Sequence, residues 1–529
     1  MWRWPSSRSV VIGIAAALFV TCCVLPVAYL LTVALSVDVA SPAPWLDARQ
    51  QGLLWNTARL GVGTALLATA IGAPLGLSLA RIPLRGKTLL RIVLVAPVLL
   101  PPFVVAIAWT NLAGGNTLLA DWTYSLPAAV LVLSLVLYPL SMLATEVALR
   151  RIDGRLEEAA VLSAPPLLVL RRITFPLAAP SVLAAALVIF VLSVSEFGVP
   201  GLLRVRVYTT EVFTAFAALY DFRRAVLLAL PLLVLCLIVA IVAVTMAGER
   251  LVTTRRGSGT RPALLQSWQR PAEAASMLTS AIALGLPVIV LLREAVRADS
   301  LRAIFEGSGS AITNSLLLAT IGATAVVGLA VWLGYARARG RGRLGQLADV
   351  LFVVTFAVPS TIVGVGLIGL WNRPGLIGAF YGTDVMFILG YLARFVPVAA
   401  LAIAAATRYV PVSHEEAAAV SGAGWFRTMT NIVLPQIRLG LLTAWIVAFV
   451  LAFGELGVSI LIAPPGEATL PIRIYTIIAN TPPSHVAALA LLQTAVILTP
   501  LAVLAFPVSL RASTAAQRVP SNAEGRDAR

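Results

Sequence analysis

Long apolar segments alternate with short polar segments along the whole chain. Six apolar segments lie near residues 10–37, 53–80, 91–113, 125–149, 177–199 and 222–248, and six more near 272–292, 311–335, 348–371, 383–406, 439–461 and 486–510. A helix of about 20 apolar residues crosses roughly 30 Å of hydrocarbon, and these segments have about that length or more. The pattern therefore predicts an all-α polytopic membrane protein with about 12 transmembrane helices.

The first apolar segment shares features with a signal peptide. It follows Arg3 and Arg8, and the small residues Ala40 and Ala43 resemble a cleavage site. Its apolar stretch is longer than a signal-peptide core of roughly 7–15 residues. We therefore expect an uncleaved first helix.

The two sets of six segments carry matching features at a nearly constant separation. Three matches are 258 residues apart: Asn56-Thr57 with Asn314-Ser315, Pro101 with Pro359, and Glu158 with Glu416. A fourth match, Glu196 with Glu455, is 259 residues apart. This self-similarity predicts that one six-helix unit has been duplicated and fused. Because six is an even number, both copies keep the same orientation, which predicts two tandem parallel six-helix repeats.

Polar stretches set the expected boundaries of the repeats. Residues 249–270 are polar and rich in arginine and glycine, which is typical of a linker. We expect a first transmembrane repeat over 1–248, a cytoplasmic linker over 249–271, a second transmembrane repeat over 272–510 and a disordered cytoplasmic tail over 511–529.

Composition agrees with a protein that lies in a bilayer. Of the 529 residues, 59% are hydrophobic and only 12% are charged. The formal charge of +16 raises the question of nucleic-acid binding, but the arginines are scattered through short loops. Such residues mark cytoplasmic loops of membrane proteins. We therefore expect membrane lipids around the chain and no nucleic-acid partner.

The basic residues also predict the orientation of the chain. We assign to the cytoplasm Arg81, Arg85, Lys87 and Arg91, then Arg150, Arg151, Arg155, Arg171 and Arg172, and in the second repeat Arg337, Arg339, Arg341 and Arg343. An opposing group, Arg204, Arg206, Arg223 and Arg224, falls on the outside and weakens the rule without reversing it. We expect a multi-pass protein of the bacterial cytoplasmic (inner) membrane with both termini in the cytoplasm.

Residue types needed for catalysis or metal binding are scarce. The chain has two histidines, and its three cysteines, Cys22, Cys23 and Cys236, all lie in apolar segments. No G-x-x-x-x-G-K-[ST] sequence for binding phosphate occurs. We expect no catalytic residue, no metal site and no cofactor bound by this chain, so any ATP is used by a partner.

A polar, small-residue island from Ser413 to Pro435 interrupts the second repeat. Ser413 followed by Glu416 has the spacing of a capping box, which predicts that a helix begins there. Small residues follow, and Gly422 and Gly424 favour the end of that helix or a bend in it. The island therefore predicts a short helix that can lie close against another surface.

The same island fits the pattern E-A-A-x3-G-x9-I-x-L-P at every specified position. The matching residues are Glu416, Ala417, Ala418, Gly422, Ile432, Leu434 and Pro435. This sequence resembles the cytoplasmic loop of ATP-binding-cassette (ABC) importer permeases. The resemblance implies a permease subunit that is not itself an enzyme, with two copies of an ABC ATPase docked at such loops. It also implies an extracytoplasmic solute-binding protein that delivers the cargo.

The first repeat carries a less complete copy of this motif. Glu158, Ala159 and Ala160 match, but the spacing to the end of the motif is one residue short. Ala164 occupies the glycine position, and Pro165 and Pro166 interrupt the loop, because proline disfavours helix in the residue before it. We expect this loop to dock with altered geometry and the second loop to be the intact coupling element.

Glu196 and Glu455 follow the motif loops by about one membrane-spanning helix, which places them near the outer boundary. Acidic groups at membrane depth are functional candidates, so both residues are candidates for the translocation path or its outer gate. A carboxylate near a boundary can instead reach water or bond to the backbone, and the sequence leaves both interpretations open.

The segment from Gly454 to Tyr475 resembles the same region of fused-repeat permeases for ferric iron. Thiamine, polyamine and aminoethylphosphonate permeases are close relatives of these, so ferric iron is the favoured cargo among four. A secondary transporter driven by an ion gradient is the rival from another class, since it would also contain repeats. That class needs ionisable residues deep in the bundle, whereas most charges here lie in loops and near segment ends. A polytopic membrane enzyme is disfavoured by the lack of a convergent set of acid and base residues.

Overall fold

The computed structural model describes residues 7–36, 47–114, 117–251, 266–297, 301–340 and 342–516. Within these residues the chain is helical and contains no strand. In the described part of the chain, nine helices are long and apolar enough to cross a membrane, or up to 12 if each of three bent helix pairs counts as one span. This confirms the predicted all-α polytopic fold.

Helices of the first repeat run from the amino terminus to the linker. They are α1 (Ser7–Phe19), α2 (Leu25–Leu35), α3 (Ala48–Arg81), α4 (Lys87–Val95), α5 (Pro102–Ala113), α6 (Thr117–Thr123), α7 (Leu126–Arg151), α8 (Gly154–Val161), α9 (Pro166–Val169), α10 (Phe175–Ser195), α11 (Gly198–Leu202), α12 (Tyr208–Phe213) and α13 (Phe222–Leu251).

Helices of the second repeat follow in a similar order. They are α14 (Gln269–Ser280), α15 (Leu286–Ala295), α16 (Leu301–Glu306), α17 (Gly309–Arg339), α18 (Arg343–Ala357), α19 (Ser360–Trp371), α20 (Val385–Arg408), α21 (Val412–Val420), α22 (Trp425–Thr428), α23 (Leu434–Gln436), α24 (Arg438–Phe453), α25 (Ser459–Ile462), α26 (Leu470–Ile477) and α27 (Pro483–Ala516). Much of the expected linker, residues 252–265, lies outside the described residues. Helix α27 continues to Ala516, so the expected start of the tail at residue 511 is too early.

Each repeat is built around one tightly packed helix pair, α3 with α7 and α17 with α20. A Cβ added to Gly76 of α3 would meet the carbonyl oxygen of Met142 of α7, and one added to Gly334 of α17 would lie 2.8 Å from that of Ala400 of α20. Gly76 and Gly334 are 258 residues apart in the sequence, and so are Met142 and Ala400. The two repeats therefore use the same packing register, which glycine permits because it has no side chain.

Two segments predicted as straight spans are broken. The segment near 91–113 bends by 91° between α4 and α5, and the segment near 348–371 bends by 95° between α18 and α19. Pro101 and Pro359 stand at the breaks, where a proline cannot donate a backbone hydrogen bond. A third bend of 76° separates Trp425–Gln436 from α24, whereas the equivalent span of the first repeat, Pro166–Ser195, is not among the bent pairs.

Carbonyl groups near each break find side-chain donors. The hydroxyl of Tyr138 donates to the carbonyl oxygen of Leu94 at 2.8 Å in the first repeat. In the second repeat, Nη1 of Arg394 donates to the carbonyl oxygen of Val358 at 2.7 Å. Unpaired backbone groups are costly in a bilayer, so these donors permit broken helices at that depth.

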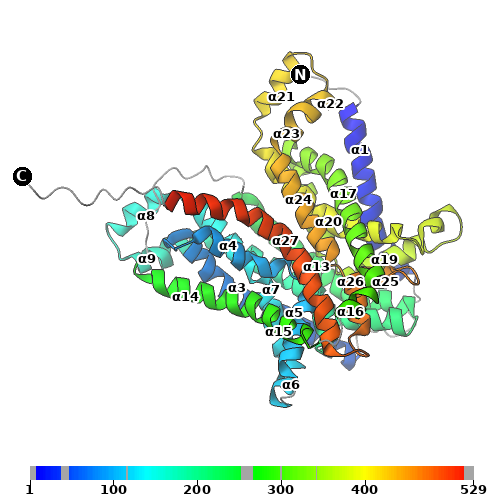
Figure 1. Ribbon diagram of the computed structural model, residues 1–529. Coiled ribbons are helices and arrows are strands. Elements are labelled where there is room, and N and C mark those ends of the chain that lie inside the picture. The colour runs from blue at the N-terminus through cyan, green and yellow to red at the C-terminus, as the bar shows by residue number, and fades with distance from the viewer. Residues whose placement is uncertain are drawn as a thin grey trace, which may run out of the picture.

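The repeats exchange their first helices. Helix α2 packs on α19 of the second repeat, and α15 packs on α5 of the first. The last helix of each repeat also packs on the other repeat, since α13 packs on α18 and α27 packs on α4 and α5. In Figure 1, α1 accordingly lies beside α17 and far from α3.

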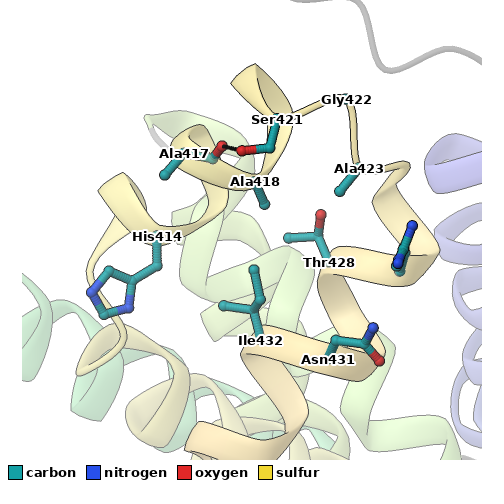
Figure 2. A pocket seen from close by; sticks show the side chains of 10 residues that line it. His414, Ala417, Ala418, Ser421, Gly422, Ala423, Thr428, Asn431 and Ile432 are labelled. Atoms are coloured by element: carbon teal, nitrogen blue, oxygen red, sulfur yellow. Dashed lines mark hydrogen bonds between the residues drawn. The ribbon is translucent and has the colours of Figure 1, made fainter.

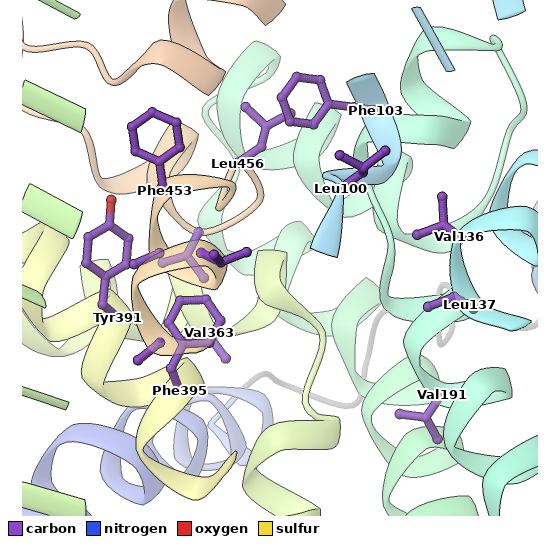
Figure 3. Close-up of a cluster of buried hydrophobic side chains, with 14 of the residues drawn as sticks. Leu100, Phe103, Val136, Leu137, Val191, Val363, Tyr391, Phe395, Phe453 and Leu456 are labelled. Carbon is purple, nitrogen blue, oxygen red and sulfur yellow. The ribbon is translucent and has the colours of Figure 1, made fainter. Parts of the chain in front are cut away.

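One apolar cluster extends through both repeats, and part of it joins them where Phe103 lies against the segment that follows α24. Figure 3 shows Leu100 and Phe103 from the first repeat near Phe453 and Leu456 from the second. Gly198 fixes this contact, because a Cβ there would lie 2.8 Å from Cβ of Phe103 and 3.5 Å from Cδ2 of Leu456. Apolar side chains thus fill the space between the two repeats where Phe103 and Leu456 lie.

Candidate functional site

The two motif copies form short helices at the ends of two separate arms. Helices α8 and α9 carry the first copy, and α21 and α22 carry the second (Figure 1). The repeats meet away from these arms, where Pro101 and Phe103 of the first repeat lie against Gly454 and Leu456 of the second (Figure 3). The motif loops are therefore the parts of the two repeats that lie apart.

The second motif helix does not begin with the predicted capping box. Helix α21 begins at Val412, with Pro411 as its N-cap residue and no side-chain cap. Pro411 has φ −60° and ψ 135°, the extended geometry of an N-cap, so the helix begins before Ser413 is reached. Ser413 then lies inside the first turn, and the prediction of a box with Glu416 is wrong. The first motif helix is capped, because Oδ1 of Asp153 accepts a hydrogen bond from the amide of Arg155 at 3.2 Å.

Gly422 ends α21 in a conformation that favours glycine. Its φ is +77°, in the left-handed region. The amide of Gly422 donates to the carbonyl oxygen of Ala419 at 3.0 Å, and the amide of Ala423 donates to that of Ala418 at 3.0 Å. This pair of bonds is a Schellman motif, the common way to satisfy the last carbonyls of a helix.

The first motif loop ends differently. Helix α8 ends at Val161, and α9 begins at Pro166 with Pro165 as its N-cap residue. Ala164 is not left-handed, since Arg204 and Tyr220 are the only described residues other than glycine with positive φ. The two prolines therefore reshape the loop as the sequence predicted.

An open groove of about 610 Å³ runs between α21 and the segment that follows it. Its lining residues are His414, Ala417, Ala418, Ser421, Gly422, Ala423, Arg427, Thr428, Asn431 and Ile432. Figure 2 shows Ala417 and Ala418 on one wall and Thr428, Asn431 and Ile432 on the other. Three of the four predicted second-copy residues thus line the groove, while the fourth, Glu416, is exposed to solvent beside it.

Each motif helix is held to the membrane helix α3 or α17 by an ion pair that the sequence analysis missed. In the second repeat, Nε of Arg339 donates to Oε1 of Glu415 at 2.7 Å, and the hydroxyl of Tyr335 donates to Oε2 at 2.8 Å. In the first repeat, Nε of Arg81 donates to Oε1 of Glu157 at 3.1 Å. The side chains of Arg81 and Glu157 are both fully buried, with 0% exposure.

The paired glutamates directly precede the motif residues Glu158 and Glu416. Glu157 also accepts a hydrogen bond from Oγ1 of Thr174 at 2.9 Å. Arg81 corresponds to Arg339 and Glu157 to Glu415, again 258 residues apart. The matching positions of arginine and glutamate in both repeats could have revealed the ion pairs from the sequence. The sequence analysis used these arginines only to predict the orientation of the chain.

The ends of α3 and α17 that hold the motif helices also contact the first helix of the other repeat. The guanidinium of Arg8, in α1, lies 5.5 Å from the ring centre of Tyr335, which binds Glu415. In the first repeat, Oε1 of Glu273, in α14, accepts a hydrogen bond from the amide of Arg85 at 2.9 Å. Arg85 lies shortly after Arg81 in the loop that ends α3.

Glu196 and Glu455 lie at the interface between the repeats. Helix α10 ends at Ser195 and α24 ends at Phe453, so both carboxylates follow their helix instead of lying within the predicted spans. Oε1 of Glu196 accepts from the amide of Gly198 at 2.9 Å, and Oε1 of Glu455 accepts from that of Val458 at 2.8 Å.

The surroundings of Glu196 bring charges from both repeats together. Glu455 and Arg394 both interact electrostatically with Glu196. Among the described residues, no group of three or more His, Cys, Asp or Glu side chains could hold a metal ion. The structure therefore places both predicted carboxylates at the junction of the repeats, where each bonds to a backbone amide of the loop that follows its helix.

Comparisons with known proteins agree with this architecture. The model of the family described as "binding-protein-dependent transport system inner membrane component" matches twice, over residues 72–252 and 326–508. An Fe(3+)-transport system permease protein of Haemophilus influenzae is 24% identical over 434 residues, which cover 81% of this chain and 84% of the relative.

Two further relatives match shorter parts of the chain. A putative ABC transporter permease of Streptomyces antibioticus is 33% identical over 187 residues, 35% of this chain and 80% of that protein. A putative 2-aminoethylphosphonate transport system permease of Salmonella choleraesuis is 31% identical over 163 residues, 28% of this chain and 57% of that protein. With the family model matched in both repeats, this chain belongs to the binding-protein-dependent transport system inner membrane components and is a fused-repeat permease of the ABC importer type.

Proposed function

We propose that this chain forms the translocation path for ferric iron, delivered by an extracytoplasmic solute-binding protein and driven by two copies of a separate ABC ATPase. The observation that carries the cargo is the extent of the match to the Fe(3+) permease, which covers 81% of this chain. The match to the aminoethylphosphonate permease covers 28%. ATP acts at the partner, and the permease needs no cofactor of its own.

The motif loops are the proposed docking sites for the ATPases. Glu416, Ala417, Ala418 and Gly422 form the second site, and Glu158, Ala159 and Ala160 form the first. Support comes from the groove beside α21, which is open and in which Ala417, Ala418, Ser421, Gly422 and Ala423 leave room for side chains of another protein. In this proposal the loops and both termini lie in the cytoplasm.

Glu196 and Glu455 are the proposed outer gate of the path. They lie where the two repeats contact each other, about one membrane-spanning helix away from the motif loops. Each carboxylate accepts a hydrogen bond from the backbone of the loop that follows its helix, α10 or α24. Movement of the repeats apart would expose these carboxylates to cargo from the outside.

Aminoethylphosphonate is the second candidate cargo. Support for it comes from the Salmonella choleraesuis relative, which is 31% identical over 163 residues.

Reconstitution tests the function and the cargo together. The permease is purified with the ATPase and binding protein that copurify with it and placed in proteoliposomes with ATP inside. We expect uptake of radioactive ferric iron that needs ATP and persists after ionophores collapse ion gradients. Uptake that stops with the gradient would instead identify a secondary transporter. Inhibition of iron uptake by excess 2-aminoethylphosphonate, or uptake of that compound alone, would reverse the order of the two cargoes.

A further inference from the structure

The Arg81–Glu157 and Arg339–Glu415 pairs occupy the same structural position in both repeats. Each arginine is the last residue of a long membrane helix, α3 or α17, and each glutamate lies in the first turn of a motif helix. A carboxylate in the first turn is also stabilised by the positive end of the helix dipole. Each contact thus joins the end of one helix to the beginning of another.

The arginines also bind the chain that leads into the motif helices. Nη2 of Arg81 donates to the carbonyl oxygen of Leu149 at 2.7 Å, near the end of α7. Nη2 of Arg339 donates to the carbonyl oxygen of Val410 at 3.0 Å, just before α21. Each arginine therefore holds both the motif helix and its entry, which leaves little freedom for that helix to move by itself.

Burial strengthens this connection. The Arg81–Glu157 side chains have 0% exposure, and Arg339 and Glu415 are 10% and 15% exposed. Separating a buried ion pair leaves two charges without partners in a poorly solvated place, which is strongly unfavourable. A force on a motif helix is therefore transmitted to α3 or α17 before the pair separates.

We propose that these two ion pairs are the rigid links through which movement of the docked ATPases reaches the membrane helices, with Glu157 and Glu415 as positioning residues. The inference rests on the proposed function and deepens it. Movement of α3 or α17 carries the tightly packed α7 or α20, because Gly76 and Gly334 bring those helices into backbone contact. The contacts of Arg8 and Glu273 extend each link to the first helix of the other repeat.

Neutral variants test whether the link is needed. In the assembled transporter, Glu415→Gln and Arg339→Gln should keep copurification of the ATPase and its hydrolysis of ATP. Ferric iron transported per ATP hydrolysed should fall roughly tenfold. The control is Arg302→Gln, which removes an exposed ion pair with Glu306 and should leave that ratio unchanged. Wild-type coupling in both link variants would overturn the proposal.

Replacing the ion pair with a covalent cross-link distinguishes a rigid link from two alternatives. One alternative is a contact that must open during transport, and the other is a contact that is needed only for folding. In the double variant Arg339→Cys with Glu415→Cys, the ion pair is absent, and the native Cys22, Cys23 and Cys236 are buried. Transport per ATP should be low, and joining the new thiols with a short reducible cross-linker should restore it several-fold, until reduction reverses the gain.

The outcomes of this second experiment are distinct. Full transport without the cross-linker, or no recovery with it, would overturn the rigid link. If the wild-type complex itself shows no ATP-driven uptake of ferric iron, the proposed function fails, independently of the variants.

Discussion

Gly334 of α17 lies against the backbone of Ala400 of α20, so close that a Cβ would stand 2.8 Å from the carbonyl oxygen. We predict that Gly334→Ala lowers the free energy of unfolding by about 1–3 kcal/mol, because two packed backbones have to move apart. Gly328, on the same helix, has no atom within 4 Å of the added Cβ and is the matched control. Thermal unfolding in detergent should show a lower midpoint for Gly334→Ala and an unchanged or raised midpoint for Gly328→Ala.

Gly422 gives the second prediction, since its φ of +77° is strained for any residue with a side chain. Gly422→Ala should disrupt the end of α21 at a cost of about 1 kcal/mol and weaken ATPase binding. Gly424, with φ −67° and open space around it, is the control for which Ala should be neutral. Pull-down affinity of the ATPase measures both. Equal affinities for the two variants would contradict the role of the turn.

The two motif loops should contribute unequally to transport. Glu416→Lys lies beside the complete groove and should uncouple transport from ATP hydrolysis while leaving membrane insertion intact. Glu158→Lys lies in the loop reshaped by Pro165 and Pro166 and should reduce transport less. Uptake of ferric iron in proteoliposomes, normalised to ATP hydrolysis, ranks the variants. Retained wild-type uptake in the Glu416 variant would count against docking at this loop.

The carboxylates between the repeats should matter for transport more than for stability. In Glu455→Gln the amide oxygen can still accept from the amide of Val458, so we expect a change in thermal midpoint of no more than about 2 °C. Loss of the charge at the proposed gate should lower ferric iron uptake severalfold. Glu467→Gln is the matched control, because that carboxylate is exposed and bonds to Asn314. Equal uptake by the two variants would leave Glu455 with a backbone-capping role alone.

The hydroxyl of Tyr138 should support the broken span of the first repeat. Tyr138→Phe removes its hydrogen bond to the carbonyl oxygen of Leu94 and should cost about 1 kcal/mol of stability. Tyr124→Phe, at an exposed tyrosine, should be nearly neutral. Thermal unfolding of the two variants side by side provides the measurement, and a matching decrease in both would contradict a specific role at the break.

Much of the fold could be predicted from local pattern. The length of each apolar segment predicts a span, and the separation of 258 residues between matching features predicts the repeat. The breaks at Pro101 and Pro359 were missed because the apolar segments continue through them. Their stability depends on donors such as Tyr138, which reach the break from another helix.

The candidate site was predictable only where its residues are neighbours in sequence. The motif around Glu416 is contiguous, so pattern alone located it. The partner of Glu157 is 76 residues away in the sequence, and only folding shows that Arg81 reaches it. Ser413 shows the converse error, since a local cap was predicted where Pro411 had already begun the helix.

The exchange of first helices has a consequence for how the protein is made. During synthesis, α1 and α2 enter the membrane long before α17, α19 and α20, against which they pack, have left the ribosome. The half synthesised first therefore cannot reach its final packing alone, and its leading helix must remain in lipid or against a chaperone until the second half arrives. Because both halves belong to one chain, the second-repeat helices on which α1 and α2 pack remain covalently connected to them.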